Sequence, residues 1–455
     1  MNDFWSGVGV DLHLEPDSAD GRRTGLERAL RDAVRDGRLA PGTRLPATRR
    51  LAADLGVSRG TAKAAYDQLV AEGYLTARQG SGTRVATLPP SLDTEAPQAH
   101  AHTRAPLFDL RPGSPDVGAF PAAAWLRALR RAIATAPSLA YDYGDPRGRI
   151  ELRTALSGYL GRARGVLAPP ERIVITSGYV QGLALLTRVL DGAAVAMEDP
   201  GLPFHREVVR RNGGTVLPVA VDARGVRPER LGEAAAVVVT PAHQYPTGVT
   251  LHPERRRALG DWARARGGLI VEDDYDGEFR YDRQPVGALQ GMAPGQVVYL
   301  GTASKTLGPA LRLGWMVLPP QLVDAVADAK LHSDHHTETI GQLALAELID
   351  SHAYDRHVRA CRLRYRRRRD QLLDQLGASR SVHGVAAGLH ALIDVPDEAE
   401  VLARAEAQGL ALGALGDHWH TPGPGRPQGL VVGYGTPRER AYPQALEVLG
   451  KVLDA

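Results

Sequence analysis

Apolar residues near the start of the chain recur at helical spacing. A first predicted helix carries apolar residues three or four positions apart, at Leu26, Leu30, Ala33 and Val34. Gly37 ends this helix. A second short helix is predicted over 47–55, and a third runs from Ser58, a natural N-cap, to Glu72. The pattern therefore predicts a helix followed by a helix-turn-helix.

The residues after the third helix favour a small hairpin. Residues 74–78 and 83–86 suit two short strands, and the Gln-Gly-Ser-Gly sequence at 79–82 suits the turn between them. A hairpin directly after a helix-turn-helix forms a β wing. We therefore expect a winged helix-turn-helix in the first part of the chain.

The later part of the chain alternates short β-branched runs with helical patterns. The runs fall at 173–176, 195–198, 237–240, 269–273, 297–301 and 314–318. This alternation predicts an α/β domain with a mostly parallel, doubly wound sheet. Ligands of such sheets bind beyond the carboxyl ends of the strands, so the residues that follow each run are the first candidates for chemistry.

A linker separates these two parts. Residues 88–106 are rich in Pro, Ala and His and show no apolar period. The predicted domains are a winged helix-turn-helix at 1–87, a linker at 88–107 and an α/β domain at 108–455.

Composition narrows the class of protein. The 455 residues include one cysteine, Cys361, which excludes an internal disulfide framework and a zinc site built from several cysteines. The N-terminus shows no basic start followed by an apolar run, and no apolar run approaches the ~20 residues that a membrane helix needs. We therefore expect a cytoplasmic protein without a membrane partner.

Two clusters of polar residues receive structural interpretations. The arginine-rich run at 361–370 is interpreted as a helix with solvated arginines. The sequence offers no third ligand to accompany the histidines at 332, 335 and 336, so we expect no metal site.

The start of the third predicted helix has the residue types that read DNA. In a helix-turn-helix, the N-terminal residues of the second helix contact base edges in the major groove. Arg59 can pair with guanine edges, while Lys63 and the hydroxyls of Ser58 and Thr61 can reach phosphates or bases. Arg49, on the preceding helix, would face the DNA backbone.

The strand ends of the α/β domain carry the groups that a phosphate-bearing aldehyde cofactor requires. Lys305 follows a predicted strand, with hydroxyls beside it and Arg312 seven residues later. A lysine amine forms a Schiff base with an aldehyde, while hydroxyls and a guanidinium hold a phosphate. The strand at 269–273 ends at Asp273, whose carboxylate could keep a pyridine nitrogen protonated, and is followed by the phenol of Tyr275. The 177–179 turn lies before a predicted helix, whose N-terminus favours phosphate.

The first part of the chain resembles a known regulator family. RLPATRRLAADLGVSRGTAKAAYDQLVAEGYLTARQGSGTRV is similar to the winged helix-turn-helix of GntR-type bacterial regulators, over about residues 22–86. This resemblance implies double-stranded operator DNA as a partner. It assigns DNA contacts to Arg49, Ser58, Arg59, Gly60, Thr61, Lys63, Gln79 and Gly80.

The rest of the chain resembles fold-type I aminotransferases over about residues 108–455. This resemblance implies a mostly parallel doubly wound sheet with a smaller C-terminal subdomain, and a joining helix that includes 361–370. TPAHQYPTG at 240–248, VEDDYDGEFRY at 271–281 and GTASKTLGPALRLGW at 301–315 are similar to the MocR branch of the GntR-type regulators. This resemblance implies a homodimer that binds pyridoxal 5′-phosphate, with Lys305 as the aldimine lysine, Asp273 at the pyridine nitrogen and Tyr275 at the ring hydroxyl. It places further cofactor contacts at Ser177, Gly178, Tyr179, Thr302, Ser304, Arg312 and Tyr245.

The chain departs from the aminotransferase pattern at three places. Tyr245 stands where aminotransferases carry Asn, so the contact to the ring hydroxyl could come from Gln244 or His243 instead. Leu202 stands where a ring-stacking aromatic is common, and Phe204 is the nearby substitute. The C-terminal run at 429–435 lacks the arginine that clamps a substrate carboxylate. This leaves Arg206 as the candidate for an effector carboxylate.

These observations lead to one functional expectation and one alternative. The chain is expected to be a transcription regulator, not an enzyme, in which pyridoxal phosphate on Lys305, alone or with an amine or amino acid, controls operator binding. By resemblance, its targets are genes of vitamin B6 or of amine and amino-acid metabolism. The alternative is an active aminotransferase with an accessory DNA-binding domain, because a lysine base and an electron sink are both present.

Overall fold

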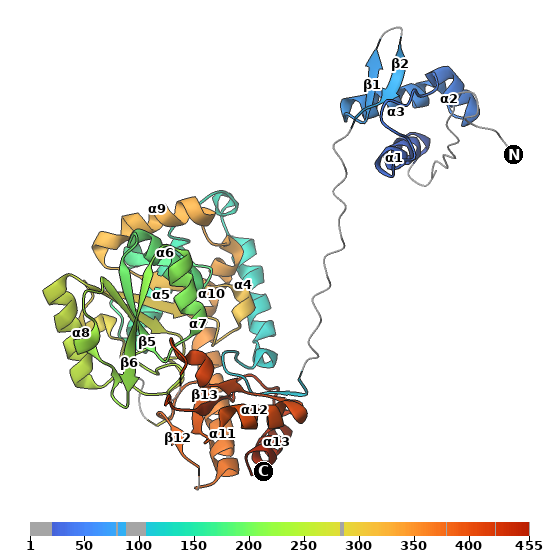
Figure 1. Ribbon diagram of the computed structural model, residues 1–455. Coiled ribbons are helices and arrows are strands. Elements are labelled where there is room, and N and C mark those ends of the chain that lie inside the picture. Colours follow the sequence, from blue (N-terminus) through green and yellow to red (C-terminus); the bar gives the residue numbers. More distant parts are fainter. Residues whose placement is uncertain are drawn as a thin grey trace. The chain divides into compact units, whose positions relative to one another are not determined.

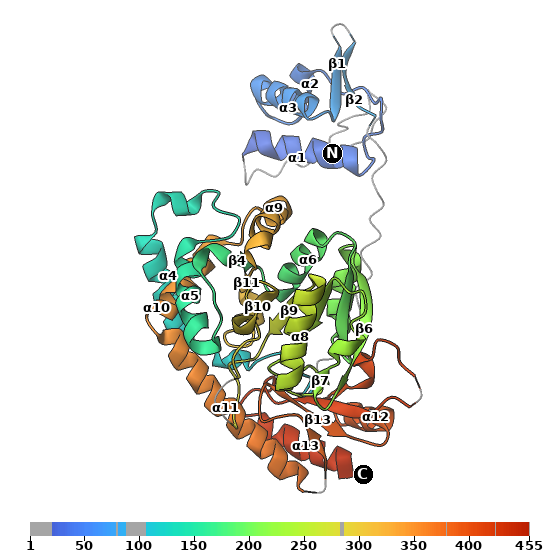
Figure 2. The same cartoon turned by 90° about the vertical axis from the view of Figure 1, so that its left-hand side faces the viewer.

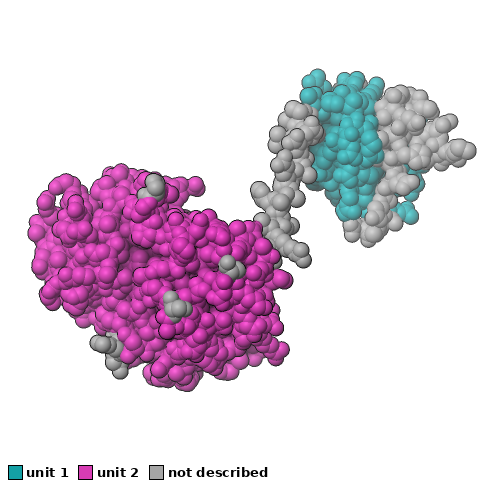
Figure 3. All heavy atoms as spheres, turned by 60° about the horizontal axis from the view of Figure 1, so that its bottom comes forward, with its two compact units in different colours: residues 1–104 teal, residues 105–455 magenta. Residues whose placement is uncertain are grey.

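The computed structural model describes residues 21–78, 81–87, 106–282, 286–378, 380–423 and 425–454. The chain divides into two compact units, residues 1–104 and 105–455, shown in different colours in Figure 3. Gln79 and Gly80, predicted at the tip of the wing, lie outside the described residues, as does the predicted linker up to residue 105.

The first unit is a small helical domain with a hairpin. Its elements are α1 (Arg22–Arg35), α2 (Thr48–Asp54), α3 (Arg59–Ala71), β1 (Leu75–Arg78) and β2 (Gly82–Val85). The side chain of Ser58 accepts a hydrogen bond from the Thr61 N–H at 3.0 Å, which caps α3 as predicted. β1 and β2 pair antiparallel. The predicted helices and hairpin are confirmed.

The apolar faces of these helices meet in one core. Leu26 and Leu30 of α1, Leu51 of α2 and Leu69 of α3 are fully buried, and Val85 of the wing joins them. Burying an aliphatic side chain of this size stabilises the fold by about 1.5–3 kcal/mol. The core fixes the three helices against one another, and the start of α3 stays on the surface.

A large sheet organises the second unit (Figure 1). Its strands are β4 (Ile173–Thr176), β5 (Ala194–Asp199), β6 (Thr215–Asp222), β7 (Gly225–Val226), β8 (Ala236–Val239), β9 (Leu269–Asp274), β10 (Val297–Thr302) and β11 (Gly314–Val317). Within the described residues they lie in the order β4-β11-β10-β9-β8-β5-β6-β7. β6, β5, β8, β9 and β10 are parallel neighbours, and β11 pairs antiparallel with both β10 and β4. The mostly parallel sheet is confirmed.

Helices cover both faces of this sheet. They are α4 (Ala122–Thr135), α5 (Ile150–Arg164), α6 (Tyr179–Val189), α7 (Pro203–Arg211), α8 (Pro253–Arg266), α9 (Val323–Asp334) and α10 (Thr339–Asp350). Successive strand residues point to opposite faces, so Tyr299 enters the core with α5 and α10, while Val298 and Leu300 enter the core with α6 and α7. A strand that is buried on both faces has a continuous apolar sequence, and the runs of the large sheet have this pattern.

A smaller subdomain completes the second unit. The long helix α11 (Ala353–Leu376) runs from beside α10 toward the C-terminal elements (Figure 2). Its remaining elements are β12 (Val382–His383), β13 (His390–Asp394), α12 (Glu398–Ala407), β14 (Leu410–Ala411), β15 (Gly413–Ala414), β16 (Gly429–Gly433) and α13 (Tyr442–Asp454). A four-stranded sheet has the order β12-β13-β16-β15, and β14 pairs with β3 (Phe108–Asp109). No helix in the described ranges is long and apolar enough to span a membrane.

Two of the differences from the sequence prediction have a clear physical reason. β6 was not predicted from the sequence. Pro218 lies inside it, and proline is rare within strands. Its residues also do not alternate regularly between buried and exposed, so the hydrophobic pattern of a strand is weak. The arginines of 361–370 are not all solvated, so that prediction was wrong for Arg368. Its side chain is 1% exposed and donates to Asp116 at 2.8 Å, because the helix packs into the C-terminal core.

Candidate functional site

A cavity of about 330 Å³ opens at the carboxyl ends of the parallel strands. Residues that follow β5, β8, β9 and β10 line it, as expected for a doubly wound sheet. The predicted residues in its lining are Lys305, Asp273, Tyr275, Arg312, Tyr179, Thr302, Ser304, Tyr245 and Arg206. The cavity therefore gathers side chains that are far apart in the sequence.

Lys305 lies at one wall of the cavity, three residues after β10. Its Nζ donates to the Gly113 carbonyl. Burial lowers the pKa of the Lys305 ammonium, while the carboxylates of Asp276 and Asp273 oppose the shift. A lowered pKa increases the fraction of neutral amine near pH 7, which is the nucleophilic form.

Asp273 lies at the end of β9 and is 5% exposed. Burial, then the neighbouring Asp274, raises the pKa of the Asp273 carboxyl well above its usual value, and Lys305 opposes this shift. A cationic donor beside it would stabilise the carboxylate. The Tyr179 hydroxyl, also in the lining, is buried without a hydrogen-bond partner in the described chain. Both groups suit a polar ligand in the cavity.

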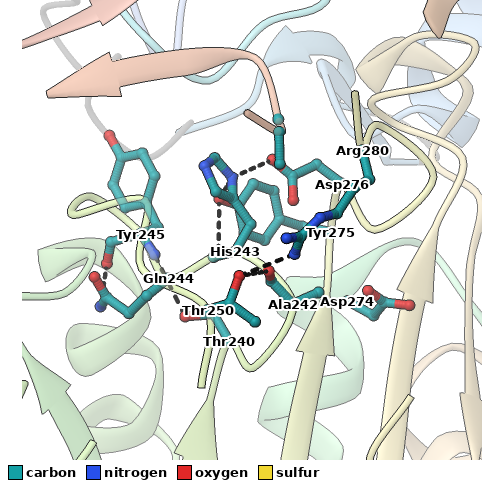
Figure 4. Close-up of polar contacts among 12 residues, drawn as sticks. Thr240, Ala242, His243, Gln244, Tyr245, Thr250, Asp274, Tyr275, Asp276 and Arg280 are labelled. Carbon is teal, nitrogen blue, oxygen red and sulfur yellow. Dashed lines mark hydrogen bonds and ion pairs between the residues drawn. The ribbon is translucent and has the colours of Figure 1, made fainter. Parts of the chain in front are cut away.

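Tyr275 and Tyr245 line the cavity beside β9 and β8 (Figure 4). The Tyr275 hydroxyl donates to the His243 carbonyl at 3.0 Å and lies 3.2 Å from His243 Nδ1. The Tyr245 hydroxyl lies 2.9 Å from His418 Nε2. The Gln244 side chain points away from the cavity. Its amide donates to the carbonyls of Pro200 and Tyr245, and its Oε1 accepts from the Thr247 hydroxyl. The phenols, and not the amide of Gln244, therefore face the cavity.

Arg312 lines the cavity close to Gly178. Thr302 Oγ1 donates to Ser304 Oγ at 2.8 Å, so two hydroxyls lie close together in this wall. Gly178 packs against Arg312: a Cβ at position 178 would lie 2.9 Å from Arg312 Nη2, and its φ is +114°. Any side chain there would displace the guanidinium, so glycine is required. Ser177 N–H donates to the Gln181 side chain at 2.8 Å.

Arg206 lines the cavity, but its guanidinium already has partners. Its Nη1 donates to the His418 carbonyl at 3.0 Å and its Nη2 to the Trp419 carbonyl at 3.3 Å. Asp199 lies 3.9 Å away. These contacts fix the 416–419 segment of the small subdomain against α7.

Several residues of the cavity wall were not predicted from the sequence. His205 lies in the wall with its ring centroid 4.3 Å from that of Tyr179, whereas Phe204 is 59% exposed. Burial lowers the pKa of His205 to about 3, so the ring is neutral. His390 reaches the wall from β13 of the small subdomain, and no local sequence signal connects it to this site.

Glu198 is a buried carboxyl in the same wall. It accepts hydrogen bonds from the Thr240 hydroxyl at 2.6 Å and from the Gln244 amide at 3.3 Å. Burial raises the pKa of Glu198 to about 7, and these hydrogen bonds oppose the shift. The group therefore changes its charge close to neutral pH.

The predicted DNA-reading residues lie on the surface of the first unit. Arg49, Ser58, Arg59, Gly60 and Lys63 are exposed, and Thr61 is half-buried. Lys63 pairs with Asp67 one helical turn later, at 2.6 Å, with both side chains largely exposed. An exposed pair of this kind contributes about 0–1 kcal/mol, so Lys63 can exchange Asp67 for another anion at little cost.

Two family models match the chain. Residues 23–85 match the gntR family of bacterial regulatory proteins, and residues 106–411 match aminotransferase class I and II. The boundary between the matches falls in the same region as the boundary between the two compact units.

Curated relatives share this order of domains along their length. The chain is 35% identical to the pyridoxine biosynthesis transcriptional regulator PdxR of Corynebacterium glutamicum, over 94% of this chain and 95% of that protein. It is 34% identical to the probable rhizopine catabolism regulatory protein MocR of Rhizobium meliloti, over 93% of this chain and 92% of that protein.

A solved structure supports the fold of the second unit. Kynurenine aminotransferase of Pyrococcus horikoshii, in complex with PMP, superposes with a TM-score of 0.70 at 26% identity, covering 77% of this chain and 91% of that one. The fold, the family models and the relatives agree. The chain belongs to the MocR-like family of GntR-type transcriptional regulators, which join a winged helix-turn-helix to an aminotransferase-like domain that binds pyridoxal phosphate.

Proposed function

We propose that this chain is a cytoplasmic, homodimeric regulator whose cofactor cavity sets the affinity of its winged helix for operator DNA. One observation carries the proposal: the cavity brings Lys305, Asp273 and Arg312 together in a chain that also presents the exposed basic start of α3. The signal is pyridoxal phosphate, alone or with an amine or amino acid.

The residues of the cavity fit pyridoxal phosphate in charge and in position. Arg312, with Ser304 and Thr302, would hold the phosphate, and Ser177 and Gly178 would support that end. Asp273 would meet the protonated pyridine nitrogen, which supplies the cation that its buried carboxylate needs. Tyr275 would contact the ring hydroxyl, with Tyr245 beside it, and the neutral ring of His205 is suited to stack on the cofactor.

When bound, pyridoxal phosphate supplies an aldehyde with which primary amines combine reversibly. Lys305 would hold that aldehyde, and an incoming amine would compete with Lys305 for it. The buried Lys305 amine would then differ in charge and contacts between the two states of the site. A ligand shifts a conformational equilibrium only through such differences in interaction between two states.

DNA recognition would rest on α3 and the wing. Arg59 is the candidate for base edges, Lys63 and the hydroxyls of Ser58 and Thr61 for phosphates or bases, and Arg49 for the backbone. Gly60 lets the start of α3 approach the groove, and Gln79 and Gly80 are proposed at the wing. The name of the relative PdxR supports pyridoxine (vitamin B6) synthesis as one target process, and that of MocR names rhizopine catabolism as another.

The test is a titration of the full-length protein against the DNA upstream of its own gene, with and without pyridoxal phosphate. Salt must be fixed, because phosphate contacts make affinity steeply salt-dependent. We expect the cofactor to change the affinity of the wild type for this DNA, and Lys305→Ala to remove the response while leaving binding intact. Specific binding that ignores both the cofactor and the substitution would contradict the proposal.

An aminotransferase is the second candidate, because the second unit has the fold of kynurenine aminotransferase and its cavity holds a lysine and a carboxylate. The anchoring of Arg206 on two backbone carbonyls argues against it, since that guanidinium is already engaged. A turnover assay with amino-acid donors and keto-acid acceptors separates the two. Rapid multiple turnover would favour the enzyme, and a single half-reaction without turnover would favour the regulator.

A further inference from the structure

Three buried side chains with metal-binding chemistry converge next to the cofactor cavity. His243 follows β8, Asp276 follows β9, and His390 begins β13 of the small subdomain. Their exposed fractions are 3%, 2% and 5%. One ligand atom from each, a ring nitrogen or a carboxylate oxygen, lies within 4.8 Å of the other two. Cofactor contacts assigned above account for none of the three.

The hydrogen bonds of this cluster leave one nitrogen unused. His243 Nδ1 lies 2.9 Å from Asp276 Oδ2, and the His243 and His390 ring centroids lie 4.8 Å apart (Figure 4 shows His243 and Asp276). His390 Nε2 is buried without a hydrogen-bond partner in the described ranges. Leaving a buried polar atom without a partner is unfavourable, so a ligand at this atom would remove that cost.

The backbone is shaped to let these side chains approach. Gly388, two residues before His390, has φ +71°, and a Cβ there would lie 2.2 Å from His243 Cε1 and 2.5 Å from Asp276 Oδ2. Only glycine permits this packing. Burial, then the neighbouring His243, lowers the pKa of His390 well below its usual value, which favours the neutral form of the ring.

Two imidazoles and one carboxyl group form a ligand set typical of divalent transition metals. Sites with two histidines and one carboxylate hold Zn²⁺ or Fe²⁺ and leave a position for water or another group. We propose that His243, Asp276 and His390 bind one divalent transition-metal ion, with Zn²⁺ as the representative ion.

Such an ion would connect two parts of the second unit. His243 and Asp276 belong to loops of the large sheet, whereas His390 belongs to the small one, so the ion would fix one against the other. The Tyr275 hydroxyl lies 3.2 Å from His243 Nδ1, which places the ion beside a wall of the cofactor cavity. The site is independent of the proposed function, since metal binding needs neither cofactor nor DNA.

The test is a titration of the full-length chain, freed of cofactor, with Co²⁺ as a visible probe and Zn²⁺ as competitor. The cofactor is removed because pyridoxal phosphate itself chelates metals. We expect one Co²⁺ per chain with the intense visible bands of a low-coordinate site, displaced by Zn²⁺. His390→Gln and Asp276→Asn should each weaken binding at least tenfold. Asp394→Asn is the matched control, because it breaks an exposed His–Asp pair, with His383 at 2.6 Å, and should change nothing.

A second measurement keeps the proposal testable where a variant fails to fold. Zn²⁺ should raise the Tm of the wild-type chain by several degrees, and a chelator should reverse the rise, because a ligand that binds the native state stabilises it. Absence of saturable binding by the wild type, or binding that His390→Gln leaves unchanged, would overturn the proposal. Histidines elsewhere would then be the metal ligands, or the cluster would be a hydrogen-bond network alone.

Discussion

The cofactor cavity and the start of α3 are built in opposite ways. Lys305, Asp273 and Tyr275 come from two strand ends and meet in a buried wall, where the pKa of each is displaced by burial. Residues 58–63 are consecutive in one helix and mostly exposed. The first site exists only after the whole sheet has formed, whereas the second is carried by a single turn of helix.

This difference determines what substitutions report. In the cavity, charge and packing are shared among buried groups, so a single change alters both stability and ligand binding. On α3, solvent screens each charge, so a change alters DNA affinity with little effect on folding. Variants in the cavity and on α3, taken in order of decreasing expected effect, test this distinction.

Lys305→Ala should abolish covalent retention of the cofactor. The lysine supplies the only amine that lines the cavity among the described residues, so borohydride labelling should fall from about one cofactor per chain to none. Absorbance of the purified protein and mass spectrometry check this. Lys451→Ala, on exposed α13 surface, is the control and should label fully. Retained labelling in Lys305→Ala would show that another lysine holds the cofactor.

Arg164→Ala should destabilise the second unit by about 3–5 kcal/mol, because it leaves the buried Asp274 carboxylate unpaired. Both side chains of this pair are 1% exposed, with a shortest contact of 2.6 Å. Arg162→Ala, on the same helix and 55% exposed, should cost at most about 1 kcal/mol. Urea unfolding measures both. Equal losses of stability would mean that burial does not determine the cost of removing either arginine.

Glu198→Gln should make the protein more stable at pH 8 than the wild type. The folded-state pKa of Glu198 is raised from 4.5 to about 7, so the native state holds this proton more tightly than the unfolded state. Its contribution is full below about pH 4.5 and is lost as the pH rises through 7, a change of about 3 kcal/mol. The neutral amide avoids that loss, so the gain should appear at pH 8 and shrink toward pH 5.

Thermal melts over this pH range measure the effect. Glu207→Gln, on the more exposed face of α7, serves as the control and should follow the wild type. If Glu198→Gln and the wild type had the same Tm at every pH, Glu198 would not be the group that titrates near pH 7, and another group of the wall would be responsible.

Arg59→Ala should weaken operator binding by about 1–3 kcal/mol and relax specificity at one base pair, while stability changes by less than about 0.5 kcal/mol. Lys63→Ala should weaken binding to all sequences alike and lower the salt slope by about one. Anisotropy titrations with operator and scrambled DNA at several salt concentrations distinguish them. A large loss of stability in either variant would contradict the surface role of α3.

The sequence predicted best what is encoded locally. The cap at Ser58, the runs of the large sheet and the position of Lys305 after a strand follow from spacing over a few residues. His205, Glu198 and His390 were missed because their role depends on where the sheets bring them, and nothing in their own neighbourhood marks it. The buried state of Arg368 is of the same kind, since only the packed C-terminal core removes it from solvent.

The central claim is that the buried cavity and the exposed helix are energetically coupled. Coupling is reciprocal, so operator DNA must change the affinity for pyridoxal phosphate by the factor by which pyridoxal phosphate changes the affinity for operator. The most direct measurement is the dissociation constant of pyridoxal phosphate for the full-length protein, with saturating operator and with scrambled DNA. We predict a difference of at least about fivefold, corresponding to about 1 kcal/mol. Equal constants would contradict the account.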